Sequence, residues 1–365
     1  MNRADGGPDA NGALWAGKRV FLTGHTGFKG GWLALWLHSL GARVRGFALA
    51  PDTSPALFQA LQLDQVIDHR LGDVRDLPAL EAAMRSWEPE VVLHLAAQPL
   101  VRRSYQTPVE TFATNVMGTV HLLDAARRCP SVQAIVVVTT DKCYENREWV
   151  WGYRESDPMG GHDPYSSSKG CAELVTAAYG RSYFATAGVG LASGRAGNVI
   201  GGGDWSEDRL VPDAIRAFVA GEPVGIRNPA STRPWQHVLE PLAGYIRLAE
   251  GLLRKDPRVT GAWNFGPDDR DVVPVADLMD RLVRAWGSGA TWENRSPPGV
   301  TPHEAAVLKL DASKARIELG WSPRWNLGRA LEQTAAWYRA FYAGTTGAAL
   351  RALCLEQIRA HQSSG

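Results

Sequence analysis

The chain has 365 residues, of which 45% are hydrophobic and 21% are charged, and its formal net charge is +1. This composition is typical of a globular protein with a large core and room for two lobes. A charge so close to zero excludes a whole-molecule field for nucleic acid or an anionic membrane, so any anionic ligand must be held locally. We also expect no membrane partner, because no apolar segment reaches the ~18 residues that a membrane span needs.

The cysteines and the first 16 residues indicate the cellular compartment of the protein. Cys129, Cys143, Cys171 and Cys354 form no Cys-x-x-Cys pair, and no histidine stands near them at metal-ligand spacing. They therefore predict reduced thiols in a cytoplasmic protein, with no metal site. Residues 1–16 are rich in Gly, Asp and Asn and have no apolar signal core, which predicts a disordered leader.

The first predicted strand, over 18–23, leads into a glycine-rich turn. The turn reads Gly24-His-Thr-Gly-Phe-Lys-Gly30, and apolar residues then follow at helical spacing from Trp32 to Leu40. This order of strand, turn and helix is the one that a dinucleotide pyrophosphate requires, because glycines let the backbone approach the phosphates and the helix N-terminus supplies free N–H groups. The spacing is GxxGxxG, and the alternative is a plain tight turn.

Two further strands, over 42–49 and 66–71, are each followed by an aspartate. Asp52 stands where the ribose hydroxyls of a dinucleotide would lie, and no Arg or Lys just after that strand is placed to meet a 2′-phosphate. This favours NAD over NADP. Asp73, after the next strand, is a candidate acceptor for an adenine amino group, and its alternative role is the N-cap of the following helix.

A fourth strand, over 91–96, runs toward Gln98 at the sheet edge where ligands of such folds collect. A helix is predicted over 107–127, through Asn115, and a fifth strand over 132–139. The alternation of strands and helices predicts an α/β protein with a Rossmann-type doubly wound parallel sheet.

Another helix is predicted to begin at Pro164. Asp163 would cap it, because aspartate accepts hydrogen bonds from the free amides and proline has no N–H to lose there. Helical periodicity places Tyr165 and Lys169, four residues apart, on one face. A phenol normally loses its proton near pH ~10, but a neighbouring ammonium and a positive nicotinamide ring would lower that pKa and make Tyr165 a base for a hydroxyl proton. The alternative is an amphipathic helix that carries Tyr and Lys at this spacing by chance.

The second half of the chain differs in character. Residues 195–233 are rich in Gly, Asn, Trp and Arg and have few continuous apolar runs, which predicts a binding lobe. A late strand over 262–265 is expected to return to the main sheet. The predicted domains are therefore 17–194 for the dinucleotide and 195–360 for a smaller, partly interleaved C-terminal substrate lobe, in which a segment near 225–270 rejoins the sheet.

The glycine turn, the strand ending in Thr140, and Tyr165 with Lys169 together resemble the extended short-chain dehydrogenase/reductase superfamily, which acts largely on nucleotide sugars. Within it, five segments in order most resemble the CDP-glucose 4,6-dehydratase family: Gly24-His-Thr-Gly-Phe-Lys-Gly30, Thr140-Asp-Lys-Cys-Tyr-Glu-Asn146, Arg195-Ala-Gly-Asn-Val-Ile-Gly201, Arg233-Pro-Trp-Gln-His237 and His303-Glu-Ala-Ala306. The resemblance implies NAD as cofactor, CDP-glucose as substrate and a homodimer paired through the helices that contain Asn115 and Tyr165.

The resemblance also implies roles for individual residues. Tyr165 would take the proton of the sugar 4-hydroxyl while the nicotinamide takes the hydride, and Thr140 would share the hydroxyl. The 4-keto group then acidifies the C5 proton, so that the 6-hydroxyl can be eliminated. Asp141 would act as the acid in that step and Lys142 would take the C5 proton, which makes the implied catalytic set Thr140, Asp141, Lys142, Tyr165 and Lys169.

The binding residues follow in the same way. The cofactor would contact Gly24, His25, Thr26, Gly27, Phe28, Lys29, Gly30, Asp73, Val74, Ala96, Ala97, Gln98, Asn115, Tyr165 and Lys169. The substrate would contact Gln98, Ser104, Tyr105, Asn198, Arg209, Arg233 and His303. Among these, guanidinium and amide donors suit the substrate pyrophosphate, although each arginine has a solvated loop charge as its alternative.

The Asp141-Lys142 pair separates this sequence from other members of the superfamily. Relatives that act on thymidine nucleotides typically carry Asp-Glu there, and epimerases usually carry small residues, so the pair argues for dehydration outside the thymidine branch. His25 and Lys29 also depart from the small or apolar residues that many relatives have in the turn. The competing hypotheses are another NAD-dependent nucleotide-sugar enzyme, either a 4-epimerase or a dehydratase of a different nucleotide sugar, and a non-catalytic NAD-binding sensor.

Overall fold

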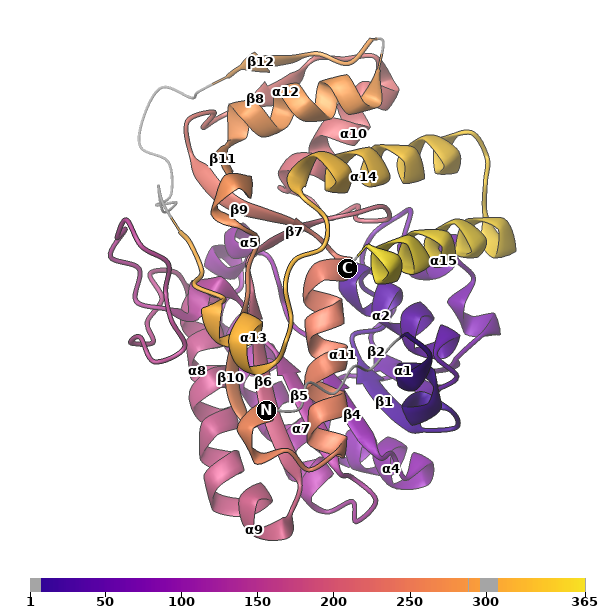
Figure 1. Cartoon of the computed structure of the whole chain (residues 1–365), viewed down its shortest axis with the longest axis vertical. Coiled ribbons are helices and arrows are strands. Elements are labelled where there is room, and N and C mark those ends of the chain that lie inside the picture. Colours follow the sequence, from indigo (N-terminus) through magenta and orange to yellow (C-terminus); the bar gives the residue numbers. More distant parts are fainter. Residues whose placement is uncertain (1–7, 288, 296–307, 365) are drawn as a thin grey trace.

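The computed structural model describes residues 8–287, 289–295 and 308–364 (Figure 1). His303, an expected substrate contact, lies outside these described residues. Within them, no helix combines the length and the apolar character that crossing a membrane requires.

A parallel sheet of seven strands forms the centre of the described structure, with the strand order β10-β6-β5-β4-β1-β2-β3. Because the winding reverses between β1 and β4, a crevice is left at the carboxyl ends of these strands, where ligands bind in such sheets. The prediction of a doubly wound α/β fold is confirmed. The strands are β1 (Arg19–Thr23), β2 (Arg43–Ala48), β3 (Asp68–Leu71), β4 (Val91–His94), β5 (Ala134–Val138), β6 (Gly190–Ala196) and β10 (Gly261–Phe265).

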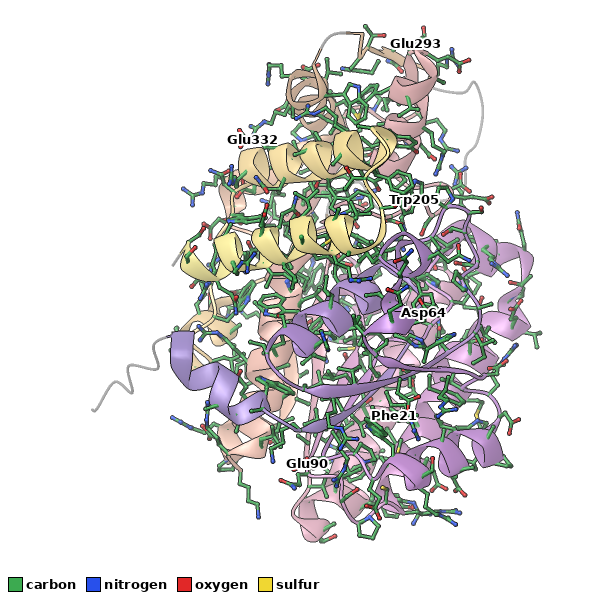
Figure 2. The ribbon with its side chains drawn as sticks, turned by 90° about the vertical axis from the view of Figure 1, so that its right-hand side faces the viewer. Phe21, Asp64, Glu90, Trp205, Glu293 and Glu332 are labelled. Carbon is green, nitrogen blue, oxygen red and sulfur yellow. The ribbon has the colours of Figure 1, made fainter. Side chains whose placement is uncertain are left out.

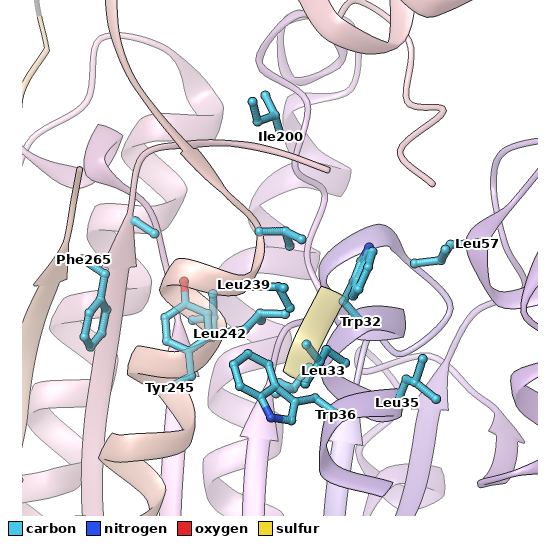
Figure 3. Close-up of a cluster of buried hydrophobic side chains, with 14 of the residues drawn as sticks. Trp32, Leu33, Leu35, Trp36, Leu57, Ile200, Leu239, Leu242, Tyr245 and Phe265 are labelled. Carbon is cyan, nitrogen blue, oxygen red and sulfur yellow. The ribbon is translucent and has the colours of Figure 1, made fainter. Parts of the chain in front are cut away.

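Successive strand residues point to opposite faces of the sheet and enter two separate cores. In β1, Val20 and Leu22 belong to one core, whereas Phe21 belongs to the other. The first core packs against α2 (Phe28–Ser39) and α11 (Leu239–Leu253), whose buried side chains meet in Figure 3. The second core involves α4 (Leu77–Trp87), α7 (Gly118–Arg127) and α8 (Pro164–Tyr179).

Shorter helical segments connect these elements. They are α3 (Leu57–Ala60), η1 (Leu63–Gln65), α5 (Val101–Gln106), α6 (Pro108–Phe112), η2 (Ala113–Met117), η3 (Asp141–Cys143), η4 (Gly180–Phe184) and α9 (Ala185–Ala187).

A smaller lobe, in the upper part of Figure 1, is built mainly from the second half of the chain. Its described strands form two small sheets, of order β11-β9-β7 and β12-β8. Two elements of this half, α11 and β10, instead lie on or in the main sheet. The remaining elements are β7 (Asn198–Ile200), α10 (Leu210–Ala220), β8 (Val224–Ile226), β9 (Thr232–His237), η5 (Pro257–Val259), η6 (Asp269–Asp271), β11 (Val272–Pro274), α12 (Val275–Trp286), β12 (Trp292–Asn294), α13 (Ser313–Glu318), α14 (Leu327–Tyr342) and α15 (Gly347–Ser363).

The N-terminal segment corrects one prediction. A helix, α1, spans Pro8–Trp15, and the Trp15 side chain is fully buried with its Nε1 donating to Glu250 Oε1 at 2.9 Å. Trp15 therefore anchors the segment to α11. The expectation of a disordered leader through residue 16 is wrong for this helix. The Trp15 ring is buried and donates a hydrogen bond to a carboxylate that is 235 residues away in the sequence.

Candidate active site

A cavity of about 1450 Å³ opens between the main sheet and the smaller lobe. Its walls come from the turn after β1, the loops after β2, β3 and β4, the end of β5, the start of α8 and the segments around β7, β8 and β9. Residues from both halves of the chain therefore face one space, which is large enough for two nucleotide-sized ligands.

The glycine turn after β1 forms one wall of this cavity. Gly24 has φ +77°, and a Cβ there would lie 2.7 Å from the Ala96 nitrogen. A Cβ on Gly30 would lie 2.1 Å from the Gly24 oxygen. Only glycine fits at these two positions. Thr26, Gly27 and the N-terminus of α2 face the cavity, so the wall presents backbone N–H groups and positive dipole potential suited to a pyrophosphate.

His25, an expected cofactor contact, does not line the cavity. Its side chain is fully buried, and its Nε2 lies 2.6 Å from His69 Nδ1. The ring also packs edge-on against Phe58. Burial, followed by the neighbouring His69, lowers the pKa of His25 to about 3, so the ring is neutral at physiological pH. The local turn pattern could not indicate this, because both ring partners are distant in the sequence.

Lys29 does line the cavity, together with Phe28. Burial, followed by the nearby Arg209, Lys169 and Lys142, lowers the pKa of Lys29 to about 7, with Asp141 partly opposing the shift. An anionic ligand placed among these cations would favour the charged form of Lys29.

The expected adenosine contacts, Asp73 and Val74, both line the cavity, as does Asp52. Asp73 accepts two hydrogen bonds from the Arg75 guanidinium, and these lower its pKa. The alternative role of Asp73 as a helix N-cap is wrong, because the N-cap of α4 is Asp76. Arg75 itself was not anticipated as a cavity residue.

The loop after β4 contributes Ala96, Ala97 and Gln98 to the cavity, as predicted. Asn115 is not part of the cavity lining. It sits in the π-helical turn η2, where its Oδ1 accepts from the Gln98 nitrogen at 2.8 Å and its Nδ2 donates to Ser168 Oγ at 2.8 Å. Asn115 therefore positions this loop against α8, and its predicted direct contact with the cofactor stays a prediction.

Two predicted substrate contacts, Ser104 and Tyr105, also lie off the cavity lining. Ser104 is fully buried; its Oγ donates to the Val101 carbonyl and accepts from the Tyr165 nitrogen at 3.1 Å. Tyr105 is 45% exposed and does not line the cavity. Ser104 therefore holds the start of α8 in place, and Tyr105 points away because the two residues are adjacent on the short helix α5.

The start of α8 follows the prediction. Asp163 accepts from the Ser166 nitrogen at 2.9 Å, and Tyr165 and Lys169 both line the cavity. The Thr140 side chain acts on the Tyr165 phenol and favours its charged form. The expected lowering of the Tyr165 pKa is not found in the protein alone: burial raises the pKa to about 12, although Thr140 opposes the rise.

The position of Lys169 accounts for the absence of the expected lowering of the Tyr165 pKa. Its Nζ donates to the Val138 carbonyl at 3.3 Å, and burial lowers its pKa to about 8. The ammonium is thus directed to the end of β5. A positive ring bound beside Tyr165 would be needed to stabilise the phenolate.

Of the two residues after Thr140, Lys142 lines the cavity and Asp141 is buried behind it. The Lys142 Nζ donates at 3.2 Å both to Asp141 Oδ1 and to Asn198 Oδ1. Asp141 is 1% exposed and is not part of the cavity lining. The Asp141 carboxylate orients Lys142 in this structure, and its predicted role as an acid stays a prediction.

Asn198, Arg209 and Arg233, the expected pyrophosphate contacts, all line the cavity. Arg209 is held by the buried Asp204, with its Nη1 at 2.8 Å from Asp204 Oδ2. The Arg233 guanidinium donates to the Thr232 carbonyl. The three residues come from β7, the segment before α10, and β9, so tertiary packing brings them together as predicted.

A buried ion pair supports the floor of the site and was not predicted. Glu173 on α8 accepts from Arg195 Nη2 at 2.8 Å, from Ser193 Oγ at 2.8 Å and from Thr139 Oγ1 at 2.5 Å. The Arg195 side chain also donates to the Tyr144 hydroxyl at 2.7 Å. This network connects α8 to the ends of β5 and β6. Sequence reasoning missed it because no local pattern pairs Glu173 with Arg195, which stands 22 residues later.

Comparison with known proteins agrees with this geometry. The family model described as GDP-mannose 4,6 dehydratase matches residues 21–262. A CDP-glucose 4,6-dehydratase of Salmonella typhimurium is 53% identical over 340 residues, which cover 91% of this chain and 93% of the relative. A dTDP-glucose 4,6-dehydratase of Streptomyces antibioticus is 30% identical over 88% of this chain and 92% of its own length.

A solved structure is similar over almost the whole described fold. It is a dTDP-glucose 4,6-dehydratase of Bacillus anthracis in complex with NAD, with a TM-score of 0.74 and 20% identity, covering 90% of this chain and 98% of that one. The sheet order, the glycine turn beside Thr140 and Tyr165, and the match over residues 21–262 lead to one conclusion: the chain belongs to the GDP-mannose 4,6 dehydratase family of the extended short-chain dehydrogenase/reductase superfamily.

Proposed function

We propose that this protein is an NAD-dependent CDP-glucose 4,6-dehydratase, a carbon–oxygen lyase of deoxysugar biosynthesis. It would convert CDP-D-glucose to CDP-4-dehydro-6-deoxy-D-glucose with loss of water. The observation that carries the proposal is that Thr140, Lys142 and Tyr165 line the same cavity as the glycine turn, with Thr140 favouring the charged form of Tyr165. The Salmonella relative supports the choice of the cytidine nucleotide.

The cavity residues fit NAD. The backbone of the glycine turn would hold its pyrophosphate, and Asp52 would accept from its ribose hydroxyls. The cavity residues of the loop after β2 are Ala48, Leu49, Ala50, Asp52, Thr53 and Ser54, which include no cation for a 2′-phosphate. When bound, NAD would accept the hydride of sugar C4 and supply it to C6.

The chain's own residues would handle the protons. Tyr165 would take the 4-hydroxyl proton, with Thr140 orienting that hydroxyl. Lys142, aimed by Asp141 and Asn198, would take the C5 proton and deliver it to the departing 6-hydroxyl, so that water leaves. When hydride adds to C6, C5 takes up one proton, which balances the proton that Tyr165 took from the 4-hydroxyl, so that no net proton is consumed. This division differs from the sequence-based one, because only Lys142 of the pair lines the cavity.

The two lobes would divide the ligands. Residues 17–194 would hold the cofactor, and residues 195–360 would hold the nucleotide sugar through Asn198, Arg209 and Arg233, with a segment near 225–270 shared with the main sheet. His303 remains a proposed contact of the same ligand.

We also propose a homodimer in the cytoplasm. Val109 (82% exposed), Met117 (46%) and Leu174 (61%) are large apolar side chains on α6, η2 and α8, which pack together, and a second copy would cover them. The four cysteines are all free thiols, as in proteins of a reducing compartment.

The test is to offer CDP-glucose, dTDP-glucose and UDP-glucose, each with NAD, and to assay for an alkali-sensitive 4-keto-6-deoxy product. We expect turnover of CDP-glucose, with deuterium at C4 of the substrate appearing at C6 of the product. Turnover of dTDP-glucose alone would overturn the cytidine assignment. A 4-epimer that keeps its 6-hydroxyl would indicate an epimerase, and NAD binding without turnover would indicate a sensor.

A further inference from the structure

A second pair of arginines faces the cavity, apart from Arg209 and Arg233. Arg102 belongs to α5, and Arg227 follows β8 in the smaller lobe. Both meet the carboxylate of Asp208: Arg102 Nη1 lies 3.2 Å from Asp208 Oδ1, and Arg227 Nη2 lies 3.5 Å from the same oxygen. One carboxylate oxygen thus links the loop after β4 to the smaller lobe at the cavity wall.

This arrangement is weak as a structural contact. The side chains are 37% (Arg102), 42% (Arg227) and 46% (Asp208) exposed, and ion pairs at such exposure contribute little to the stability of a fold. Asp208 also has φ +55°, in the left-handed region that Asp and Asn adopt more readily than most residues. A carboxylate held only by such exposed ion pairs is readily displaced from them.

Asp204, four residues earlier, provides the contrast. Its side chain is 4% exposed and it holds Arg209 at 2.8 Å, so that pair is built into the protein interior. Asp208 instead presents its carboxylate to solvent inside the cavity. The loop therefore carries one structural carboxylate and one that is free to exchange places with a ligand anion.

We propose that Arg102 and Arg227 form a second anion-binding pair for the diphosphate of the nucleotide sugar, and that Asp208 occupies this pair until the ligand displaces it. Guanidinium groups match phosphate oxygens as well as carboxylate oxygens, and a diphosphate brings more negative charge than one carboxylate. Asp208 would thereby select against ligands of low charge, because their attraction to the two arginines would not offset the loss of the Asp208 ion pairs. The proposal rests on the proposed function, in that it assigns the anion to the nucleotide sugar.

The test is calorimetric binding of CDP, and of inorganic pyrophosphate, to the full-length protein and its variants. Asp208→Asn keeps a residue that tolerates the left-handed backbone and removes the competing charge, so CDP should bind about three- to tenfold more tightly. Arg102→Gln and Arg227→Gln should each weaken CDP binding by about three- to tenfold. Cytidine, which has no phosphate, should bind equally to all of these proteins.

Glu332→Gln is the matched control. Glu332 forms an exposed ion pair with Arg329 on α14, outside the cavity lining (Figure 2), and its variant makes the same change in net charge. It should leave CDP binding unchanged. An unchanged or weaker CDP affinity in Asp208→Asn would overturn the proposal, as would an equal gain in Glu332→Gln.

The proposed function can fail separately. If the Asp208 and arginine variants change CDP and pyrophosphate binding as expected but CDP-glucose is not turned over, the anion-binding pair stands and the dehydratase assignment falls. If CDP-glucose is turned over and the binding of both anions is insensitive to all three variants, the dehydratase assignment stands and the anion-binding pair is refuted.

Discussion

Asp141 and Lys142 are adjacent in the sequence and in contact at 3.2 Å, yet only Lys142 lines the cavity. The Asp141 carboxylate is 1% exposed, and its Oδ2 has no hydrogen-bond partner among the described residues. Its Oδ1 accepts from Lys142 Nζ and from Thr140 Oγ1. Asp141 therefore acts through its two neighbours, and its burial fixes the direction of the Lys142 ammonium toward the cavity.

Lys142→Met should slow elimination more than oxidation, because it removes the group that exchanges the C5 proton while leaving Tyr165 in place. Loss of a general base costs about 10²–10⁴ in rate. In a single turnover with CDP-glucose, NADH absorbance should therefore accumulate on the variant. If no NADH forms at all, Lys142 acts in oxidation or binding instead.

Tyr165→Phe should retain the fold and lose the oxidation step, since it removes only the hydroxyl that would take the substrate proton in the cavity. We expect turnover of CDP-glucose to fall by about 10²–10⁴. Tyr105→Phe is the control, because Tyr105 is half-exposed and outside the cavity lining. Activity of the Tyr165 variant within a few-fold of wild type would rule out its role as the base.

Lys29 should make stability depend on pH. Its pKa is about 7 in the fold and 10.5 as a free side chain, mainly because of burial. The unfolded chain binds this proton more tightly than the folded protein does. The free-energy cost of burying the charged side chain is therefore fully present below pH 7, and it falls as pH rises from about 7 to 10.5. Lys29→Met should therefore stabilise the ligand-free protein by about 1–2 kcal/mol at pH 6.5.

Urea unfolding at pH 6.5 and at pH 9.5 measures this effect. The stability gain of Lys29→Met should be smaller at the higher pH, where the wild-type side chain is already almost entirely neutral in the fold. A gain of the same size at both pH values would show that it comes from packing of the methionine and not from the charge.

Glu173→Gln should destabilise the protein by about 3–5 kcal/mol, because it leaves the buried Arg195 guanidinium without its counter-charge. The comparison of urea midpoints with Glu332→Gln, an exposed pair, isolates the effect of burial. Replacing both partners, as Glu173→Leu with Arg195→Met, should cost less than Glu173→Gln alone. A double variant less stable than the single one would argue against an uncompensated charge as the cause.

Leu174→Asp should yield a monomer if α8 forms the dimer interface, because a carboxylate would be buried against the second copy. Ile317→Asp, on α13, is the control, since Ile317 is even more exposed at 82% and lies outside the proposed interface. Sedimentation velocity at micromolar protein distinguishes the two. A wild-type protein that sediments as a monomer would end the dimer proposal.

The sequence by itself determined the features that depend on neighbouring residues. The Asp163 cap, the spacing of Tyr165 and Lys169, and the order of strand, glycine turn and helix are local, because capping and helical periodicity act over a few residues. The Gly30 requirement is local for the same reason, since the turn places Gly30 against Gly24, whereas the close approach of Ala96 to Gly24 comes from the neighbouring strand.

Tertiary structure alone decided which side chains reach the cavity. His25 turns to His69, Asn115 binds Gln98, and Asp141 is buried while Lys142 is not. Arg102, Asp208 and Arg227 converge from three separate segments. These outcomes depend on how distant elements pack and on the burial of each charge, and local periodicity carries no information about either.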